Sequence, residues 1–119
     1  MVQQSTTSRL SSARVRSARD SLLTEAARGV LDPVSDVLCE PTRTQIVRAL
    51  SLAPLSVGEL AATLNRSKSA TSQHLRVLRD GGVVAPRRRG RAVIYSLVPS
   101  PMVDATVQVI DRAAAITVA

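Results

Sequence analysis

Two short amphipathic helices joined by a tight turn, between residues 56 and 79, constrain the fold of this chain more than any other feature. Apolar residues recur there at three- and four-residue intervals, which predicts one buried face on each helix. They are Val57, Leu60, Ala61, Leu64, Leu75 and Leu78. Asn65 tolerates a left-handed backbone and can end the first helix, and Ser67 can cap the second. The stretch is therefore predicted to be a helix-turn-helix.

The second of these helices carries an unusual set of polar residues on its outer face. They are Lys68, Ser69, Ser72, Gln73, Arg76 and Arg79. All can donate hydrogen bonds and none is acidic, which suits phosphates and base edges in a major groove. The alternative at this point is a helical protein whose polar residues only face water. His74 lies within the same helix and is counted among the predicted DNA-binding residues, although it could either pack at the joint of the two helices or reach a phosphate.

A basic β-hairpin is predicted directly after the helix-turn-helix. Residues 83–86 and 92–97 are rich in β-forming residues and flank a tight turn that contains Gly90. Four arginines crowd this turn, namely Arg87, Arg88, Arg89 and Arg91. A helix-turn-helix followed by a basic hairpin is a winged helix. The predicted fold is thus mainly α with a small β-hairpin (α+β), with about five helices and a two-stranded wing.

Positive charge is concentrated in two parts of the chain. The net charge is +7. Residues 66–91 hold eight basic residues and one acid, a net +7, and residues 1–19 hold four arginines and no acid. The rest of the chain sums to −4. The excess charge therefore falls on the predicted second helix, the hairpin and an N-terminal arm, as a nucleic-acid contact surface requires.

Length and composition bound the remaining possibilities. A chain of 119 residues is long enough for one domain, and without Phe or Trp its core must be aliphatic. No apolar run approaches the ~18 residues of a membrane span, and the N-terminus lacks an apolar signal core, so no membrane association is expected. The single cysteine excludes an internal disulfide and fits a reducing cytoplasm.

The N-terminal segment is predicted to be an arm. Residues 1–9 are polar, rich in Ser and Thr, and predicted to be disordered. Residues 1–19 are therefore expected to form a flexible basic arm ahead of a domain at residues 20–119. The arm either contacts DNA or is a solvated tail.

Further helices are predicted before and after the helix-turn-helix. The first is clearest over residues 20–28. Asp32 and Pro33 then supply the cap and first turn of a short helix. Pro41 opens another helix, which should end before Pro54. A last helix begins beyond the proline-rich segment 99–101.

Four motifs follow one another in a fixed order along the chain. They are Pro41-Thr42-Arg43, residues 67–78 with Ser72-Gln73-His74-Leu75, Gly81-Gly82-Val83-Val84, and Arg89-Gly90-Arg91 with Tyr95. Together they resemble the ArsR/SmtB family of bacterial winged-helix repressors, over about residues 35–115. The resemblance implies a sequence-specific DNA-binding transcriptional regulator. It also implies that Arg43 lies on the scaffold helix, in a structural role or near the DNA-facing side.

The last predicted helix has a narrow apolar stripe formed by Val103, Val107, Ile110 and Ala114. Such a stripe either packs on its own domain or pairs with a second copy. In the resembled family the first and last helices form the dimer interface, which implies a homodimer in which Leu22 joins the stripe. The second helix of the helix-turn-helix in each copy would then enter one of two successive major grooves of a palindromic operator, about 34 Å apart.

Catalytic chemistry is not expected from this sequence. One His and one Cys leave no constellation of nucleophile, base and orienting group. Ser72 and His74 are neighbours, but residues two apart point to different sides of a helix. The chain is therefore predicted not to be an enzyme.

Metal binding and cofactors are not expected either. Many members of the resembled family place Cys-x-Cys at the positions of Ser56 and Gly58 here. Others use histidines on the last helix, which here offers Asp104 and Asp111 but no His. Carboxylates alone make a weak site for zinc or nickel, which favour imidazole or thiolate. Sensing is then left to a separate partner protein, to a small molecule, or to expression level.

Cys39 stands where the resembled family commonly has a small residue, which implies a buried space-filling residue, with a redox or metal role as the alternative. For DNA, the expected roles divide between helix and hairpin. Gln73 could pair with adenine and Lys68 with guanine, whereas the hairpin arginines would hold phosphates. The rival functions are a protein-docking winged helix and non-specific nucleic-acid binding.

Overall fold

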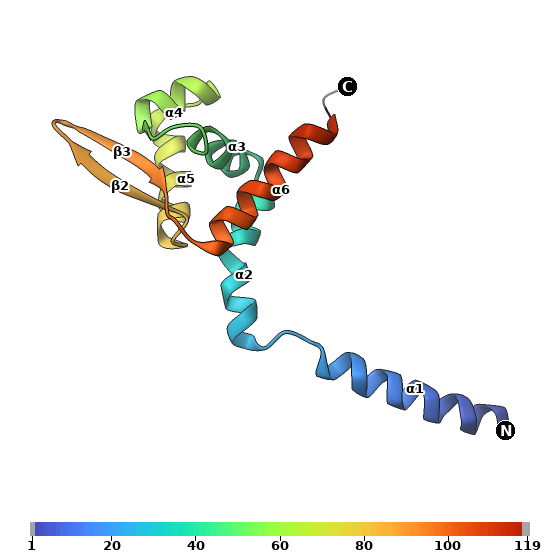
Figure 1. Ribbon diagram of the computed structural model, residues 1–119. Helices are drawn as coiled ribbons and strands as arrows, with labels where there is room; N and C mark the ends of the chain where they lie inside the picture. Colours follow the sequence, from blue (N-terminus) through green and yellow to red (C-terminus); the bar gives the residue numbers. More distant parts are fainter. Residues whose placement is uncertain (1, 118–119) are drawn as a thin grey trace.

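The computed structural model describes residues 2–117, with side chains placed from residue 11 onward. The described part contains six helices and three strands (Figure 1). In chain order they are α1 (Val2–Asp20), α2 (Glu25–Leu38), α3 (Pro41–Leu50), β1 (Leu55–Ser56), α4 (Val57–Leu64), α5 (Lys68–Asp80), β2 (Val84–Arg89), β3 (Ala92–Leu97) and α6 (Pro101–Thr117). The mainly helical winged-helix fold predicted from the sequence is confirmed.

One aliphatic core holds α2 to α6 and the base of the sheet together. Its most deeply buried members come from α2 to α5, and include Val37 of α2 as well as Ile46, Leu60, Leu75 and Leu78. These are the inner-face positions that the three- and four-residue spacing predicted for α4 and α5. Burying each such side chain contributes about 1.5–3 kcal/mol. The core therefore fixes which face of α5 is left outside.

The wing is part of a three-stranded antiparallel sheet with strand order β1-β3-β2, one strand more than the sequence predicted. The additional strand β1 pairs Leu55 with Tyr95 and Ser56 with Ile94. A strand of two residues is too short to show an alternating pattern, so periodicity could not reveal it. It joins the start of α4 to the base of the wing, which places wing and helix-turn-helix in one unit.

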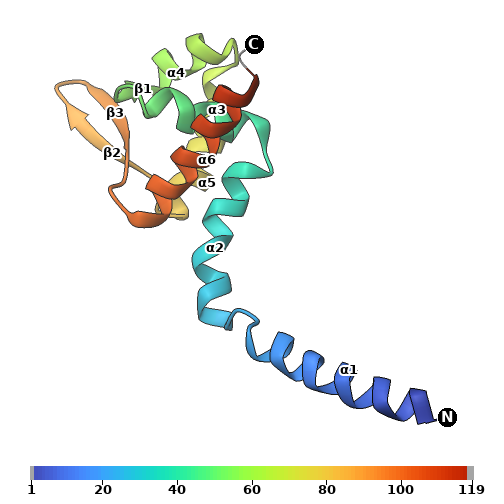
Figure 2. The same cartoon turned by 45° about the vertical axis from the view of Figure 1, so that its right-hand side comes forward.

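The N-terminal third differs most from its prediction. The helix expected over residues 20–28 is interrupted, because α1 ends at Asp20 and α2 begins at Glu25. Thr24 caps α2, its Oγ1 accepting a hydrogen bond from the main-chain nitrogen of Ala27 at 3.1 Å. Residues 1–9 were expected to be disordered, but residues 2–9 belong to α1. Figures 1 and 2 show α1 projecting away from the rest of the chain.

Pro33 does not begin a helix, as the sequence suggested, but lies inside α2. A proline in a helix loses a main-chain hydrogen bond and usually kinks or ends the helix. Here the ring packs against the end of α5, where a Cβ added to Gly81 would lie 3.2 Å from the Pro33 Cβ. Tertiary packing therefore outweighs the local preference for a helix start at this position.

Helix α6 turns its predicted stripe inward. Val103 and Ile110 are 6% and 7% exposed and belong to the core of their own chain, while Val107 and Ala114 are half-buried. Leu22, predicted to join them at a dimer interface, lies in the connection between α1 and α2 and is exposed. The chain's own core thus covers most of Val103 and Ile110, which leaves little of these two side chains for the predicted dimer interface.

An ion pair also ties α6 to the scaffold, with Arg48 Nη1 of α3 at 2.6 Å from Asp111 Oδ1. Within residues 2–117, no helix combines the length and apolarity needed to cross a bilayer.

Candidate nucleic-acid interface

The turn of the helix-turn-helix is built by local hydrogen bonds that its sequence dictates. Asn65 adopts the left-handed conformation at φ 54° and ψ 48°, as predicted, and ends α4. Ser67 Oγ accepts a hydrogen bond from the main-chain nitrogen of Ala70 at 3.0 Å and caps α5. Ser56 and Glu59 form a reciprocal capping box at the start of α4. Both helices therefore start and stop at defined residues, which sets the angle at which α5 is presented.

A capping box has a sequence signature, Ser-x-x-Glu, that could have been read from residues 56–59 in advance. Thr71 stands where the resembled family usually has an apolar residue. It occupies an inner position of α5, is fully buried, and satisfies its hydroxyl by donating to the carbonyl of Ser67 at 2.8 Å. A buried polar group needs such a partner. The inner face of α5 is therefore buried and fully hydrogen-bonded even at this polar position.

The outer face of α5 exposes the side chains that the sequence assigned to DNA. Lys68, Ser69, Ser72, Gln73 and Arg76 are all exposed. Lys68 lies across the first turn of α4, where a Cβ added to Gly58 would be 3.5 Å from its Cε. The absence of a side chain at Gly58 thus leaves room for the lysine stem.

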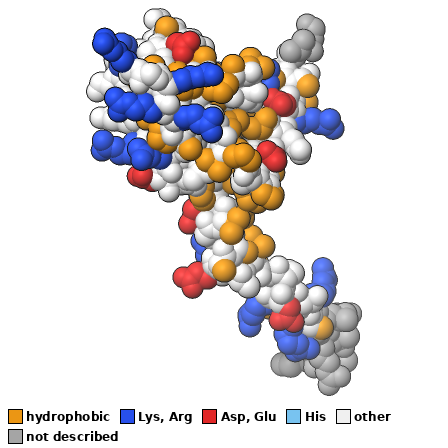
Figure 3. All heavy atoms as spheres, turned by 60° about the vertical axis from the view of Figure 1, so that its left-hand side comes forward, with side chains coloured by type: hydrophobic (Ala, Val, Ile, Leu, Met, Phe, Trp, Pro, Cys, Tyr) orange, Lys and Arg blue, Asp and Glu red, His pale blue; other side chains and the backbone are white. Residues whose placement is uncertain are grey.

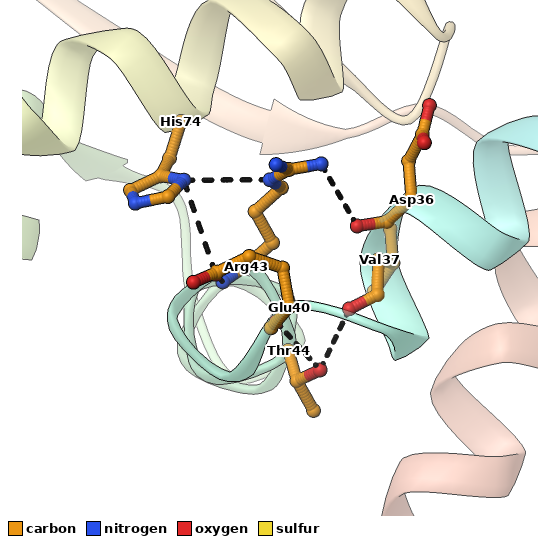
Figure 4. A network of polar contacts seen from close by, with 6 residues as sticks. All are labelled: Asp36, Val37, Glu40, Arg43, Thr44 and His74. Atoms are coloured by element: carbon orange, nitrogen blue, oxygen red, sulfur yellow. Dashed lines mark hydrogen bonds and ion pairs between the residues drawn. The ribbon is translucent and has the colours of Figure 1, made fainter.

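His74 differs from these residues, because its ring faces the start of α3 and only a quarter of its side chain is exposed (Figure 4). Arg43 Nε donates a hydrogen bond to His74 Nδ1 at 3.4 Å, and Arg43 Nη1 donates to the Asp36 carbonyl at 3.0 Å. Of the two positions that the sequence left open for His74, the structure shows packing at the joint between helices. Of the two roles expected for Arg43, its hydrogen bonds to His74 and Asp36 support the structural one.

Glu40 completes this network at the N-terminus of α3. Its Oε2 accepts a hydrogen bond from the main-chain nitrogen of Arg43 at 2.9 Å and lies 3.9 Å from His74 Nδ1. The hydrogen bond from Arg43 lowers the pKa of the Glu40 carboxyl below its ordinary value, and a positive charge on His74 would act in the same direction. Glu40 is thus held as a carboxylate at the base of α5.

The wing exposes its arginines along one strand and the following turn. Arg87, Arg88 and Arg89 end β2, Arg91 follows Gly90, and all four side chains are exposed. Gly90 has φ 63°, a left-handed conformation that glycine adopts at no steric cost. Figure 3 shows basic side chains gathered on the head of the molecule, the part that carries the wing and the helix-turn-helix.

These basic groups are free of acidic partners within the described part of the chain. The ion pair found there is Arg48–Asp111, and His74 Nδ1 lies 3.9 Å from Glu40 Oε2; neither contact includes a side chain of the wing or of the exposed face of α5. Unpaired exposed cations attract polyanions over roughly a Debye length, about 8 Å at physiological salt. The surface can therefore bind phosphates without first breaking internal ion pairs.

Metal-ligand chemistry has little representation among the described residues. No cluster of three or more His, Cys, Asp or Glu side chains there is arranged to hold a metal ion. Cys39 follows the last residue of α2 and is exposed, so the buried space-filling role predicted for it is wrong. That prediction came from the small residue which the resembled family commonly has at this position, but here the end of α2 leaves Cys39 exposed.

Comparison with known proteins agrees with this geometry. Residues 40–85 match the family described as bacterial regulatory protein, arsR family. The repressor SdpR of Bacillus subtilis is 31% identical over 67 residues, which are 56% of this chain and 74% of SdpR. The chain belongs to the ArsR family. The matched range begins at Glu40 and ends in β2, so it includes the helix-turn-helix together with Glu40, Arg43 and His74.

Further relatives and a solved structure extend the similarity. The HTH-type transcriptional regulator Rv2034 of Mycobacterium tuberculosis is 42% identical over 69 residues, 58% of this chain and 64% of the relative. The structure of HlyU from Vibrio cholerae aligns with a TM-score of 0.69 and 34% identity, over 76% of this chain and 97% of HlyU. The chain spans 64%, 50% and 57% of the length of three curated relatives, Rv2034, NmtR and the Synechocystis SmtB homolog.

The family assignment confirms the resemblance that the sequence motifs indicated. The named relatives are transcriptional regulators, which agrees with the predicted non-enzymatic class. They include a repressor, SdpR, and an activator, HlyU.

Proposed function

We propose that this ArsR-family chain is a sequence-specific DNA-binding transcriptional regulator that acts as a homodimer. The observation that carries the proposal is the exposed face of α5, where a group of five hydrogen-bond donors lies next to a wing of four exposed arginines. The five donors are Lys68, Ser69, Ser72, Gln73 and Arg76, and none of them is acidic. A helix of this kind fits the major groove of B-DNA, where base edges present a pattern of donors and acceptors unique to each base pair.

Base reading and phosphate binding are divided between the two parts of this surface. Gln73 pairs with adenine and Lys68 with guanine, each good pair giving about 1–3 kcal/mol of discrimination. Ser69, Ser72 and Arg76 flank them on the same exposed face. The wing arginines Arg87, Arg88, Arg89 and Arg91 hold phosphates or enter the minor groove, which positions the protein without specifying sequence.

The proposed dimer uses the outer faces of α2 and α6 in place of the stripe that the core covers. Ala105, Val109, Arg112 and Ile116 form a second stripe on α6, and all four are exposed. Val30, Leu31 and Leu38 of α2 are also exposed, as are Leu22 and Leu23 before it. Large apolar side chains gathered on a surface indicate a contact with another protein. A two-fold axis at this surface would place two α5 helices on an operator with two half-sites.

Two further aspects follow from the proposal. A regulator of bacterial DNA works in the cytoplasm, as the single thiol also suggested. Because strong thiolate or imidazole ligands are lacking at the positions that the family uses, sensing is assigned to a separate partner protein or a small molecule. Calorimetric titration of the isolated protein with Zn²⁺, Ni²⁺ and Co²⁺ tests this assignment, and stoichiometric sub-micromolar binding would contradict it.

The DNA proposal is tested by selecting binding sequences from a library of random duplexes and measuring affinities by fluorescence anisotropy. We expect one enriched motif with two related halves, bound about 10³-fold or more tightly than a scrambled duplex at physiological salt. Equal binding to both duplexes that weakens steeply with salt would instead indicate non-specific coating. No binding to either duplex would favour a protein-docking role for the winged helix.

A further inference from the structure

We infer that His74 is a positioning residue that must be neutral for tight DNA binding, so that its protonation weakens binding. The inference rests on the proposed DNA-binding function. It departs from the simpler expectation that a histidine on this helix contacts a phosphate. The observations that carry it are the direction of the ring, the fixed protonation of its partner, and the position of a carboxylate behind it.

The hydrogen bond between α3 and α5 determines the tautomer of His74. An arginine Nε–H is always a donor, because the guanidinium stays protonated in proteins. His74 Nδ1, 3.4 Å away, must therefore carry a lone pair, and the ring proton of the neutral imidazole lies on Nε2. The same guanidinium donates to the Asp36 carbonyl, so Arg43 connects α2, α3 and α5 at one point (Figure 4).

Protonation of Nδ1 would remove this acceptor. The new N–H would face the Arg43 Nε–H, setting two donors and two positive charges against each other at hydrogen-bonding distance. The nearby group that could accept a hydrogen bond from the new N–H is Glu40, whose Oε2 lies 3.9 Å from Nδ1. That oxygen already accepts from the main-chain nitrogen of Arg43 and caps α3. At low pH, His74 would therefore lose the hydrogen bond from Arg43 and be attracted to the Glu40 carboxylate instead. This change would disturb the contact between α3 and α5 that orients α5.

Other charged groups near α5 do not compensate. On α4, Glu59 is held in its own capping box. On α2, the main-chain carbonyl of Asp36 accepts from the guanidinium, and the Asp36 side chain is exposed. The β2 arginines are exposed on the wing. Imidazole is the side chain that ordinarily changes charge between about pH 5 and 8, and His74 is the single histidine of the chain. Replacing this one side chain therefore removes every imidazole from the chain.

The sign of the pH effect separates this inference from a phosphate contact. If binding requires neutral His74, protons compete with DNA and affinity falls as the pH falls, by at most about tenfold per pH unit for one proton. If the ring instead contacts a phosphate, the added positive charge strengthens binding as the pH falls. The two roles thus predict opposite slopes.

Two substitutions of His74 provide a second test between positioning through Arg43 and direct contact with a phosphate. In His74→Asn the amide oxygen can occupy the Nδ1 position and accept from Arg43 without titrating. In His74→Gln the amide reaches the Nε2 position, which faces away from Arg43. The inference predicts that His74→Asn keeps affinity within about threefold at pH 8 and loses the pH dependence, whereas His74→Gln binds about tenfold more weakly. A phosphate contact predicts the reverse order.

The experiment first records the imidazole nitrogens of the free, full-length protein by NMR, which needs no DNA. A neutral ring with its proton on Nε2, perturbed by Arg43→Lys, supports the contact, and a proton on Nδ1 overturns it. Affinity for the selected duplex is then measured by anisotropy from pH 8 to 5.5 at constant ionic strength. Circular dichroism confirms that each variant is folded.

Failure of the proposed DNA-binding function can be distinguished from failure of the inference about His74. Absence of any preference for the selected duplex at pH 8 overturns the proposed function, and with it the effect of His74 on DNA. Specific binding that is unchanged or stronger at pH 5.5 overturns the inference alone. The expected result is specific binding that weakens about three- to tenfold in acid for the natural protein and stays level for His74→Asn.

Discussion

Helices α5 and α6 bury similar faces but expose opposite ones. Each packs aliphatic side chains into the same core, Leu75 and Leu78 from α5 and Val103 and Ile110 from α6. On the outside, α5 carries donors and cations, whereas α6 carries the stripe with Val109 and Ile116. The inner faces therefore determine the fold. The difference between the outer faces indicates a polyanion as the partner of α5 and another polypeptide as the partner of α6.

The largest effect is expected from placing charges on the outer face of α6. Val109→Glu combined with Ile116→Glu should dissociate the dimer and lower operator affinity about 10²- to 10⁴-fold, because each half-site then binds alone. Sedimentation velocity and anisotropy measure the two effects. Leu52→Glu is the matched control, since Leu52 is 85% exposed in the connection between α3 and β1. A double variant that remains dimeric would remove α6 from the interface.

Substitution on the inner face of α5 should reduce stability. Leu75→Ala leaves a cavity at a side chain that is 1% exposed, and should lower the free energy of unfolding by about 2–5 kcal/mol. Urea denaturation of the dimer at fixed protein concentration measures it. Ser72→Ala, on the exposed face of the same helix, should change stability little. Similar decreases in both variants would contradict the division of α5 into inner and outer faces.

The outer face of α5 and the wing should respond differently to alanine. Gln73→Ala should relax sequence preference by about 1–3 kcal/mol at one position of each half-site. Arg89→Ala should weaken selected and scrambled duplexes about equally, and it should reduce the slope of affinity against salt by about 1 for each phosphate that the protein no longer binds. Anisotropy with both duplexes at several salt concentrations separates the two. An equal decrease of selectivity in both variants would count against the assigned roles.

The turn before α5 should show a smaller effect. Asn65→Ala forces a residue that disfavours the left-handed conformation into it, and should cost about 1–2 kcal/mol of stability. Asn65→Gly should be tolerated, because glycine adopts this conformation freely. Thermal unfolding of the two variants provides the comparison. Equal stability of both would mean that the turn adopts another conformation in solution.

The smallest effect concerns acid stability at Glu40. Because the folded-state pKa of Glu40 is lowered, its contribution to stability is present above the ordinary value of 4.5 and is lost as the pH falls through the folded-state pKa. Glu40→Gln should therefore flatten the pH dependence of stability on the acid side. Unfolding measured from pH 6 to 3 tests this. An unchanged pH profile would show that the carboxylate contributes nothing through this shift.

The accuracy of the sequence predictions differs between the two halves of the molecule for a physical reason. The helix-turn-helix is specified locally, by Asn65, Ser67 and the spacing of Leu60, Leu75 and Leu78, so each element is consistent with its own sequence. In α2 the local signals at Asp32 and Pro33 were misleading, because packing against Gly81 keeps Pro33 inside a longer helix. A local sequence pattern cannot show which residue from a distant part of the chain will pack against a given helix.

By itself, the sequence determined the winged-helix class, the positions of α4 and α5, and the concentration of positive charge on the exposed side of α5 and on the wing. Periodicity and capping act within a few residues, and so they can be read from a single chain. Only the tertiary structure decided that the Val103 and Ile110 stripe faces inward, that β1 joins the wing, and that His74 turns toward Arg43 and Glu40. These outcomes depend on residues far apart in the chain, such as Leu55 and Tyr95, and no local pattern contains that information.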